Sequence, residues 1–458
     1  MLLKTLELPL WLRFNKLGVD WRITIKEGKM EPMWRFALIL LLVVLLCPHR
    51  THAQCFPAIF YFGDNDGDTG GIHASFPNTT AAESPPYGET YFGKPQGRNS
   101  DGRLIIDFIA GAFGLPFLDP YLQSVSSDFS GGVTFATWGA TARTISYVSD
   151  FPLVTQIAQF QLFQKEVVAI LNSTSSLLAS RNLLANANNE LQQSQPGIHP
   201  YKKLYNDLFI NTNTTVDPIL QRALAVAQRI PMGTAFSQGL YMMSIGTNDF
   251  KAGILAAQTP AQILLYLPTV VTFITNAVND LYNYGARNII VSGVGTIGCS
   301  PSLLAVIPYT LADLDNWGCL TAYNTIARNY NILLKAGLAN VTTFTPGANI
   351  IYLDNYQMQH NLLFNYTMNG MVESINACCG VPTTTYNYDP EVLCGEEGDI
   401  ANILTVSTTC TDPASYAGWD GIHYTDAANH YFAEQIFSGQ FFDPPFSLLG
   451  NNCTTLPI

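Results

Sequence analysis

Asp420 and His423, near the C-terminus, are the residues whose types and spacing most clearly suit catalysis. Histidine is the side chain best suited to moving a proton near neutral pH, and a carboxylate that accepts its second ring N–H holds it in one orientation. The two residues flank a glycine and an isoleucine, so both can lie on one loop. They predict acid–base chemistry, although the pair alone is more typical of a turn before the helix expected at 426–437, with Thr425 or Asp426 as its N-cap.

Other short blocks contain residues of the kinds that acyl transfer requires. That reaction needs a nucleophile, a base, a group that orients the base, and hydrogen-bond donors for the developing oxyanion. One block, 62–70, includes Asn65, another ends at Gly139, and a third, 246–249, includes Asn248. The third block alone is equally typical of a turn at the end of a strand.

The elements around these blocks must bring them together. Apolar runs predict buried strands at 57–62, 240–245, 288–293 and 349–354. Helical spacing predicts helices at 104–113, 154–171, 261–284 and 321–338, the third of them broken or kinked at Pro268. This alternation predicts a single-domain, three-layer α/β/α fold with a mostly parallel sheet. Chemistry is expected beyond the carboxyl ends of its strands, after Phe62, Ile245 and Gly293.

The blocks at 62–70, 132–139, 246–249 and 419–425 resemble, in order and placement, those of the GDSL esterase/lipase family, the plant type of SGNH hydrolase. The segments 85–88, 97–98, 100–103 and 298–299 add to the match, which covers nearly the whole chain after residue 53. The resemblance implies an SGNH-hydrolase-like fold. It also implies acyl esters of plant metabolites, lipids or acetylated sugars as substrates, without choosing among them.

The resemblance further assigns roles to single residues. His423 would be the base and Asp420 its orienting partner, and the Gly139 N–H and the Asn248 side chain would be oxyanion donors. Where the family has its nucleophilic serine, however, this chain has Asn65. A carboxamide is a poor nucleophile, and loss of the nucleophile costs well-studied serine proteases roughly a million-fold in turnover. Ordinary serine esterase activity is therefore expected to be weak or absent.

Two functions from different classes fit such a site. In the first, His423 moves a proton in a bound small molecule during an elimination, isomerisation or cyclisation, or directs slow attack by water on an ester, and Asn65 adds a third oxyanion donor. In the second, the chain is a non-catalytic protein that binds a glycan or metabolite, since fold does not fix function. Thr69, Ser84 and Ser300 are conceivable substitute nucleophiles. If Asn65 is instead a sequencing or gene-model error for serine, the ordinary serine esterase reaction is expected.

Metal binding is the less favoured interpretation of the acidic first block. Asp64, Asp66 and Asp68 alternate as in a calcium loop, but such a loop would need Gly in place of Thr69 and Glu in place of Ser75. A turn rich in aspartate and glycine is the simpler interpretation. Zinc is disfavoured because no Cys-x-x-Cys pair or histidine-rich cluster is present. We expect neither a metal nor a cofactor.

The N-terminal region predicts entry into the secretory pathway. An apolar run at 36–47 is followed by the small-residue pattern that ends at Ala53, which indicates a signal peptide at 30–53. Residues 1–29 do not fit the short basic region of a signal peptide and are interpreted as a doubtful extension, with translation starting at Met30 or Met33. The expected domain is 54–458, and its expected destination is extracellular, with the vacuole as an alternative.

The cysteines and glycosylation sequons agree with that compartment. Without Cys47 the cysteines form an even set, which predicts disulfides whose pairing is not readable: Cys55, Cys299, Cys319, Cys378, Cys379, Cys394, Cys410 and Cys453. Asn-x-Ser/Thr sequons, which predict surface glycans, begin at Asn78, Asn172, Asn213, Asn340, Asn365 and Asn452.

Charge and composition limit the classes of binding partner to be expected. The formal net charge of −12 argues against nucleic acid and anionic membranes, so a small molecule or a glycan is the expected ligand. The signal-peptide run is shorter than the roughly 20 residues of a membrane span, and no later segment predicts a clean one. The aromatic residues, 12% of the chain, are interpreted mainly as core.

Overall fold

The structure, a computed structural model, describes residues 56–145, 148–181, 183, 199–210, 217–449 and 455–457. The predicted extension at 1–29 and signal peptide at 30–53 lie outside the described residues. Cys55, Cys453 and the sequon asparagines Asn213 and Asn452 also lie outside them.

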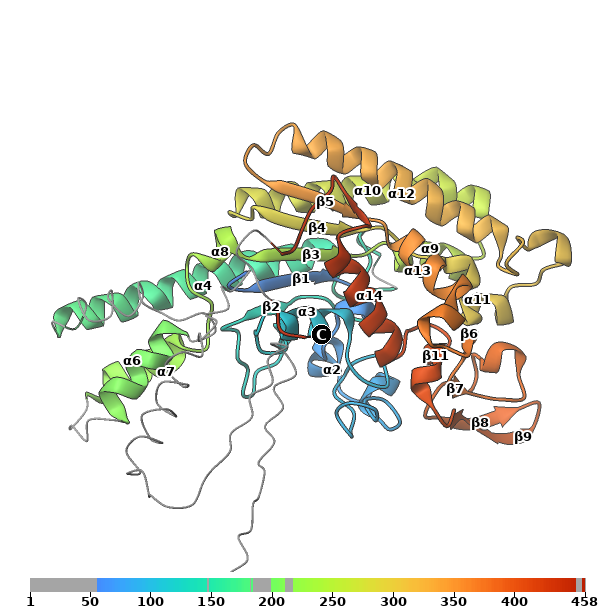
Figure 1. The fold of residues 1–458 in the computed structure, drawn as a ribbon, viewed down its shortest axis with the longest axis horizontal. Coiled ribbons are helices and arrows are strands. Elements are labelled where there is room, and N and C mark those ends of the chain that lie inside the picture. The colour runs from blue at the N-terminus through green and yellow to red at the C-terminus, as the bar shows by residue number, and fades with distance from the viewer. Residues whose placement is uncertain are drawn as a thin grey trace, which may run out of the picture. The chain divides into compact units, whose positions relative to one another are not determined.

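A central sheet carries the fold (Figure 1). Its strands are β1 (Ile59–Gly63), β2 (Gly132–Thr134), β3 (Leu240–Ser244), β4 (Asn288–Ser292), β5 (Asn349–Leu353) and β12 (Phe442–Asp443). They lie in the order β12-β5-β4-β3-β1-β2. All neighbouring pairs are parallel except β12 with β5, which is antiparallel. The four strands predicted from apolar runs are thus β1, β3, β4 and β5. Short β2 and β12 were not predicted, because two or three residues give no readable pattern.

Helices cover both faces of this sheet, and further helices lie beyond its edges. The helices of the described residues are α2 (Gly71–Ser75), α3 (Ile105–Ala112), α4 (Leu153–Ser180), α6 (Pro200–Phe209), α7 (Pro218–Ala227), α8 (Ala235–Gln238), α9 (Thr247–Leu255), α10 (Pro260–Asn283), α11 (Pro301–Val306), α12 (Thr321–Thr342), α13 (Asn355–Phe364) and α14 (Asp426–Ser438). The predicted N-cap of α14 is confirmed, because Thr425 Oγ1 accepts a hydrogen bond from the backbone N–H of Ala428.

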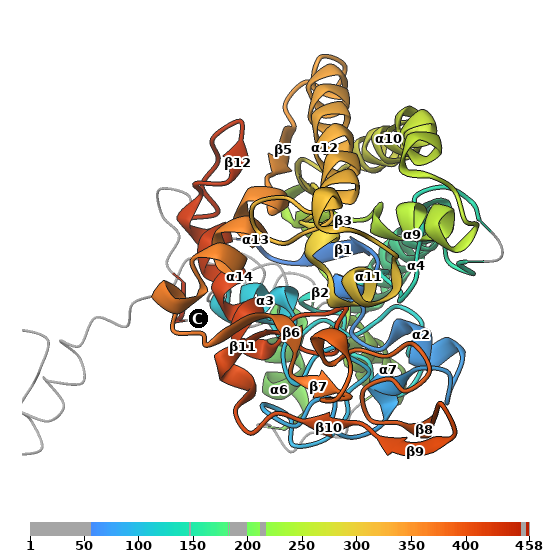
Figure 2. The same ribbon diagram turned by 90° about the vertical axis from the view of Figure 1, so that its right-hand side faces the viewer.

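Alternation along the strands sends side chains into two separate cores. Phe60 and Phe62 of β1 pack with apolar residues of α4, α10 and α12, whereas Ile59 and Tyr61 pack with those of α3 and α14. Figure 2 shows α3, α13 and α14 on one side of the strands and α4 and α10 on the other. The fold is therefore the predicted three-layer α/β/α arrangement with a mostly parallel sheet.

The helix α10 has no break at Pro268, one of the two outcomes predicted there. It continues through Pro268 without a break, and Thr272 Oγ1 donates to the Pro268 carbonyl. Among the described helices, α10 is long and apolar enough to cross a membrane, judged by length and composition only. Its apolar face, which includes Ile263, Leu267 and Ile274, is buried in the core shared with α4 and α12. A core helix of this kind meets the same length and composition test.

Between α13 and α14 the chain forms small two-stranded sheets and carries most of the described disulfides. The strands are β6 (Glu373–Ala377), β7 (Cys379–Gly380), β8 (Glu397–Ile400), β9 (Ile403–Val406), β10 (Thr408–Thr409) and β11 (Tyr416–Gly418), paired as β6 with β11, β7 with β10, and β8 with β9. The disulfides are Cys378–Cys410, Cys379–Cys394 and, ahead of α12, Cys299–Cys319. The predicted disulfides are thus confirmed for these cysteines.

Candidate active site

Three strand ends bring predicted site residues to one edge of the sheet. Asn65 opens a 3-10 helix (Asn65–Gly67) directly after β1. Asn248 lies in the first turn of α9, which follows β3, and Gly139 lies in the loop after β2. Because β1 pairs in parallel with both β2 and β3, the three segments leave the sheet side by side.

Asp68 holds the first block in place. Its carboxylate accepts hydrogen bonds from the backbone N–H groups of Gly70 (2.9 Å), Gly71 and Ile72 (3.3 Å), at the start of α2. It also accepts one from the N–H of Trp138 (2.7 Å), the residue before Gly139. The aspartate therefore links the first block to the second. Both oxygens of Asp68 thus accept from backbone N–H groups, as expected of an aspartate in a turn.

Asp420 and His423 form the predicted pair. His423 Nδ1 lies 2.6 Å from Asp420 Oδ2, and both side chains are buried. Asp420 also accepts from the backbone N–H groups of Ile422 (2.9 Å) and His423 (2.8 Å), and from the hydroxyl of Tyr87 (2.8 Å). Burial alone would raise the pKa of Asp420, but the His423 ring and these hydrogen bonds lower it to about 2. The carboxylate is therefore ionised and fixed on the imidazole.

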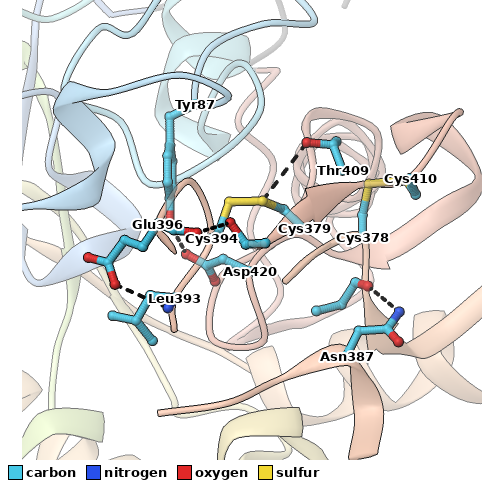
Figure 3. Close-up of a disulfide and its surroundings, with 12 residues drawn as sticks. Tyr87, Cys378, Cys379, Asn387, Leu393, Cys394, Glu396, Thr409, Cys410 and Asp420 are labelled. Carbon is cyan, nitrogen blue, oxygen red and sulfur yellow. Dashed lines mark hydrogen bonds between the residues drawn. A yellow bond between two sulfur atoms is a disulfide. The ribbon is translucent and has the colours of Figure 1, made fainter. Parts of the chain in front are cut away.

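The disulfide-bonded strands support the loop that carries this pair (Figure 3). Trp419, fully buried, donates its backbone N–H to the His423 carbonyl at 2.7 Å and accepts from the Cys379 N–H at 2.7 Å. Its ring packs beside Tyr87 and the cysteines in a small separate core. Tyr87 points at Asp420 from this core, so the same cluster that packs the loop supplies one of its hydrogen bonds.

Asp420 makes the stability of the fold depend on pH. Because its pKa falls from 3.8 to about 2 on folding, it stabilises the protein above about pH 4, and this contribution disappears as the pH falls toward 2. The difference in unfolding free energy between wild type and Asp420→Asn should shrink by about 2 kcal/mol between about pH 5 and pH 2. Urea unfolding at a series of pH values measures it. A constant difference would contradict the lowered pKa.

Gly421 allows the tight loop between Asp420 and His423. Its φ is +87°, and a Cβ atom there would lie 2.5 Å from Cδ2 of Tyr388. We expect Gly421→Ala to lower the unfolding free energy by about 1–3 kcal/mol. Gly418→Ala is the matched control, because its Cβ would meet only the Asn376 and Ile375 carbonyls, at 3.7 and 4.0 Å. Equal thermal stability of the two variants would show that the loop tolerates a side chain at residue 421.

The Asn65 side chain contacts three other residues of the predicted site: Gly139, Asn248 and His423. Its Oδ1 lies 3.0 Å from the Gly139 backbone nitrogen and 3.3 Å from Asn248 Nδ2, and its Nδ2 lies 2.6 Å from His423 Nε2. A backbone N–H only donates, so the atom facing Gly139 must be the carboxamide oxygen. The NH2 group then faces His423, whose Nε2 must accept. In this arrangement the ring proton lies on Nδ1, toward Asp420.

The role expected of Asn65 as a third oxyanion donor does not describe this arrangement. The carboxamide oxygen accepts from Gly139 and Asn248, and so occupies the position at which those donors would bind a substrate oxygen. Its NH2 group is turned toward the base instead. The reason is geometric: a planar amide reaches both sides of the site at once and bonds to both.

The conceivable substitute nucleophiles are placed differently from Asn65. Thr69 is buried, and its hydroxyl donates to the Leu118 carbonyl at 2.8 Å, whereas Ser84 is exposed. Ser300 lines the site cavity, but its hydroxyl contacts Ser302 Oγ at 2.7 Å and the Gly421 carbonyl at 3.1 Å. The described contacts of these three hydroxyls thus include no base.

Asp249 and Arg143 also shape the site, although neither was among the residues predicted from the sequence. Asp249 is buried and accepts from the backbone N–H groups of Ala142 (2.7 Å) and Arg143 (3.2 Å), and from Arg143 Nε (2.9 Å). These bonds hold the loop that carries Gly139 against the first turn of α9, which carries Asn248. Adjacency to Asn248 was the available signal, but the partner at residue 143 has no motif of its own.

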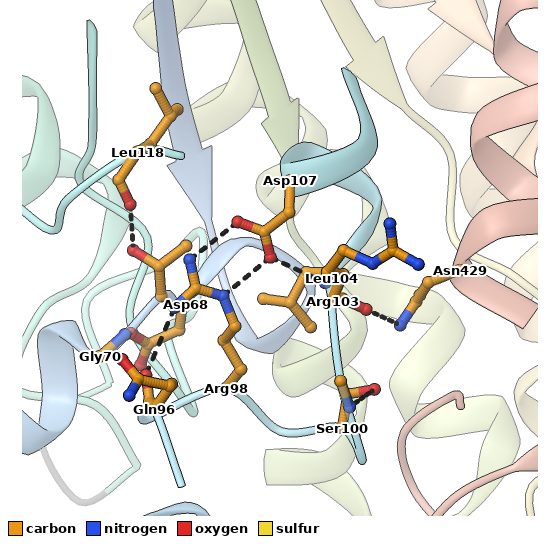
Figure 4. A network of polar contacts seen from close by, with 12 residues as sticks. Asp68, Gly70, Gln96, Arg98, Ser100, Arg103, Leu104, Asp107, Leu118 and Asn429 are labelled. Atoms are coloured by element: carbon orange, nitrogen blue, oxygen red, sulfur yellow. Dashed lines mark hydrogen bonds and ion pairs between the residues drawn. The ribbon is translucent and has the colours of Figure 1, made fainter. Parts of the chain in front are cut away.

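Buried polar contacts fix the segment next to the first block (Figure 4). Arg98 donates from Nε and Nη2 to the two oxygens of Asp107, each at 2.7 Å, and both side chains are buried. Asp107 also accepts from the Leu104 N–H at the start of α3. Breaking such a pair from one side typically costs about 3–5 kcal/mol. The pair therefore locks the segment before α3 onto that helix.

A cavity of about 320 Å³ opens onto Asn65, Asn248 and His423. Ile375 of β6 and the loop residue Tyr388 line part of its wall. Much of the rest is formed by apolar side chains of α9, of α11 and of the residue after α11: Phe250, Ile254, Leu255, Leu303, Val306 and Ile307. Its size suits a small organic molecule. Among the described residues, no group of three or more His, Cys, Asp or Glu side chains is arranged to hold a metal ion.

Comparison with known proteins gives a single family. The sequence model of the family described as GDSL-like lipase/acylhydrolase matches residues 59–436, a range that includes every predicted site residue. GDSL esterase/lipase At4g01130 of Arabidopsis thaliana is 36% identical over 92% of this chain and 97% of its own length. GDSL esterase/lipase ENOD8 of Medicago truncatula is 33% identical over the same shares. Alpha-L-fucosidase 3 of Arabidopsis thaliana is 32% identical over 90% of this chain and 98% of its own length.

Proposed function

The chain belongs to the GDSL-like lipase/acylhydrolase family, and from that membership we propose that Asn65 stands at the position of the family's nucleophilic serine. The protein then acts on a small metabolite or its ester through acid–base chemistry of His423 and Asp420, without an acyl-enzyme. Candidate reactions are elimination, isomerisation, cyclisation or weak ester hydrolysis by water.

The hydrogen-bonded state of His423 is the observation that carries this proposal. Asp420 accepts a hydrogen bond from the His423 Nδ1–H, so the Nε2 lone pair faces the cavity side of the site, where it now accepts from Asn65. A neutral imidazole with an available lone pair is a general base. The arrangement therefore keeps the proton-accepting half of a hydrolase site without its nucleophile.

A ligand carbonyl would replace the Asn65 carboxamide oxygen at the donors. The Gly139 N–H and the Asn248 amide point at one oxygen position, which is the geometry that stabilises a developing oxyanion or enolate. Rotation of Asn65 about its side-chain bonds would free this position. His423 Nε2 would then be free to take a proton from the ligand or from a water molecule beside it.

A non-catalytic binding function is the second candidate, and one observation favours it. Asn65 satisfies the donors and the base within the protein, so the catalytic residues need no substrate to complete their hydrogen bonds. On this account the cavity binds a metabolite or glycan and releases it unchanged. The name of the fucosidase relative supports a glycan as one class of ligand for either function.

Secretion forms part of the proposal. The predicted signal peptide, the described disulfides and the sequons at Asn78, Asn172, Asn340 and Asn365 support an extracellular or vacuolar glycoprotein. Mass spectrometry of the protein purified from a plant host would identify the mature N-terminus and the glycans. A mature chain that keeps residues 30–53 would contradict this assignment.

His423→Ala tests the catalytic function. Wild type, His423→Ala and the control His430→Ala, which changes a histidine on α14 away from the cavity, would be incubated with a plant metabolite extract and with a short p-nitrophenyl ester. We expect any product formed by the wild type and His430→Ala to be missing with His423→Ala. Ligands retained by all three proteins, with no product from any of them, would favour the binding function instead.

A further inference from the structure

Lys251 is a charged residue in the site cavity for which the proposed chemistry has no use. It lies on α9, one helical turn beyond Asn248, and lines the same cavity as Asn65 and His423. Its side chain is half-buried. Its neighbours in the wall, Phe250 and Ile254, are apolar. Of the described residues that line this cavity, it alone is a lysine or arginine.

The Lys251 ammonium group has no ion-pair partner among the residues that the structure describes. The nearest sources of negative potential are Asp420 and Asp64, which oppose the lowering of the Lys251 pKa by burial. Asp420 is already bonded to the His423 ring, Tyr87 and backbone N–H groups. Neither carboxylate lies within ion-pair distance of Lys251.

The other acidic groups of the cavity do not compensate the lysine either. Burial raises the pKa of Asp64 well above its usual value, and the charge of Asp66 raises it further. Burial also raises the pKa of Asp66. Neither side chain forms an ion pair with Lys251 among the described residues, and Asp420 forms its pair with His423. A half-buried ammonium group with no fixed counter-charge is costly unless a ligand supplies one.

The geometry points to a ligand with two polar ends. We propose that Lys251 binds a carboxylate of the ligand while the ligand carbonyl lies at Gly139 and Asn248, an inference that rests on the proposed function. Asn248 and Lys251 lie one helical turn apart on α9 and line the same cavity. A short ligand, with its carbonyl and carboxylate about three to five bonds apart, would reach both. The apolar wall contacts the chain between them. Small hemi-esters of dicarboxylic acids are of this class.

Binding of a matched pair of esters tests the site. Monomethyl glutarate carries an ester and a carboxylate at this spacing, and dimethyl glutarate is its neutral counterpart. Equilibrium dissociation constants for the full-length glycosylated protein would be measured by ligand-observed NMR for wild type, Lys251→Met, Lys251→Arg and Lys165→Met. Methionine keeps most of the length and apolar character of lysine. Lys165 is exposed on α4 and its substitution removes the same charge away from the cavity.

We expect wild type and Lys165→Met to prefer the monomethyl ester by about tenfold or more. Lys251→Met should lose this preference without weaker binding of the dimethyl ester, and Lys251→Arg should keep part of it. Absence of the preference in wild type, its survival in Lys251→Met, or no binding of either ester would overturn the carboxylate site.

The outcome is separable from that of the proposed function. Binding is measured without turnover, and His423→Ala reports on proton transfer alone. A preference that depends on Lys251 in a protein without His423-dependent products would keep the carboxylate site and remove the catalytic function. A His423-dependent product without the ester preference would do the reverse.

Discussion

Asn65→Ser is expected to raise the hydrolysis of a short p-nitrophenyl ester at least about a thousandfold over wild type, because it recovers part of the roughly million-fold that a nucleophile supplies. The substitution has two effects at once. It places a hydroxyl on the residue whose side chain now reaches His423 Nε2. It also removes the carboxamide oxygen from the Gly139 N–H and Asn248 Nδ2, so that both can donate to the substrate oxyanion. Asn248 Nδ2 keeps its contacts with the Ala140 carbonyl (3.1 Å) and Asp64 Oδ2 (3.3 Å), which hold it in place.

Asn65→Ala separates the two effects. It frees the donors in the same way but supplies no nucleophile, so its rate should stay within about tenfold of wild type. Steady-state release of p-nitrophenol from the purified proteins gives the comparison. An organophosphate probe with mass spectrometry would place the nucleophile, because it should label residue 65 in the serine variant only. Equal rates for the two variants would contradict the assignment of Asn65 to the nucleophile position.

Asp420→Asn, introduced together with Asn65→Ser, is expected to lower the recovered kcat by about ten-thousandfold, the loss seen for the equivalent change in serine proteases. The reason is the tautomer. The carboxylate accepts a hydrogen bond from the His423 Nδ1–H, with Nδ1 2.6 Å from Asp420 Oδ2, whereas an amide NH2 in its place favours a bare Nδ1 and a proton on Nε2. The lone pair would then no longer face residue 65.

Tyr87→Phe is the matched control for that change. It removes one hydrogen bond to the same carboxylate oxygen, 2.8 Å long, but leaves the charge and the bond to His423 intact. A loss of about tenfold or less is expected, in line with a single hydrogen bond. Tyr87→Phe is also combined with Asn65→Ser, and kcat is measured for both double variants. A loss for Tyr87→Phe as large as for Asp420→Asn would mean that packing of the loop, and not the tautomer, sets the rate.

Much of the fold could be predicted because its longer elements have clear patterns. Strands β1, β3, β4 and β5 appear as continuous apolar runs bounded by glycine or polar residues, and α3, α10 and α12 match their predicted positions within a few residues. The prediction at Pro268 was wrong in expecting a break, since the apolar face of α10 is buried on both sides of the proline. Tertiary packing there outweighs the local cost of the missing hydrogen bond.

The sequence predicted which residues form the site, but not the hydrogen bonds between their side chains. Block order identified Asp420, His423, Gly139, Asn248 and Asn65, and the strand ends bring them together. The direction of the Asn65 amide depends on which neighbouring groups only donate, and that is a property of the folded arrangement. Lys251 and Arg143 gave no sequence signal, because a single basic residue is ordinary until its surroundings are known.

The span of chain between Asn65 and His423, which is 358 residues, has a consequence for assembly. The segment with Asn65 leaves the ribosome well before the loop with His423, which is synthesised 358 residues later. Contacts between such distant segments form late in folding, after the intervening chain has lost its conformational freedom. The base therefore meets residue 65 only once the sheet has formed, and a nascent or prematurely terminated chain contains no assembled acid–base site.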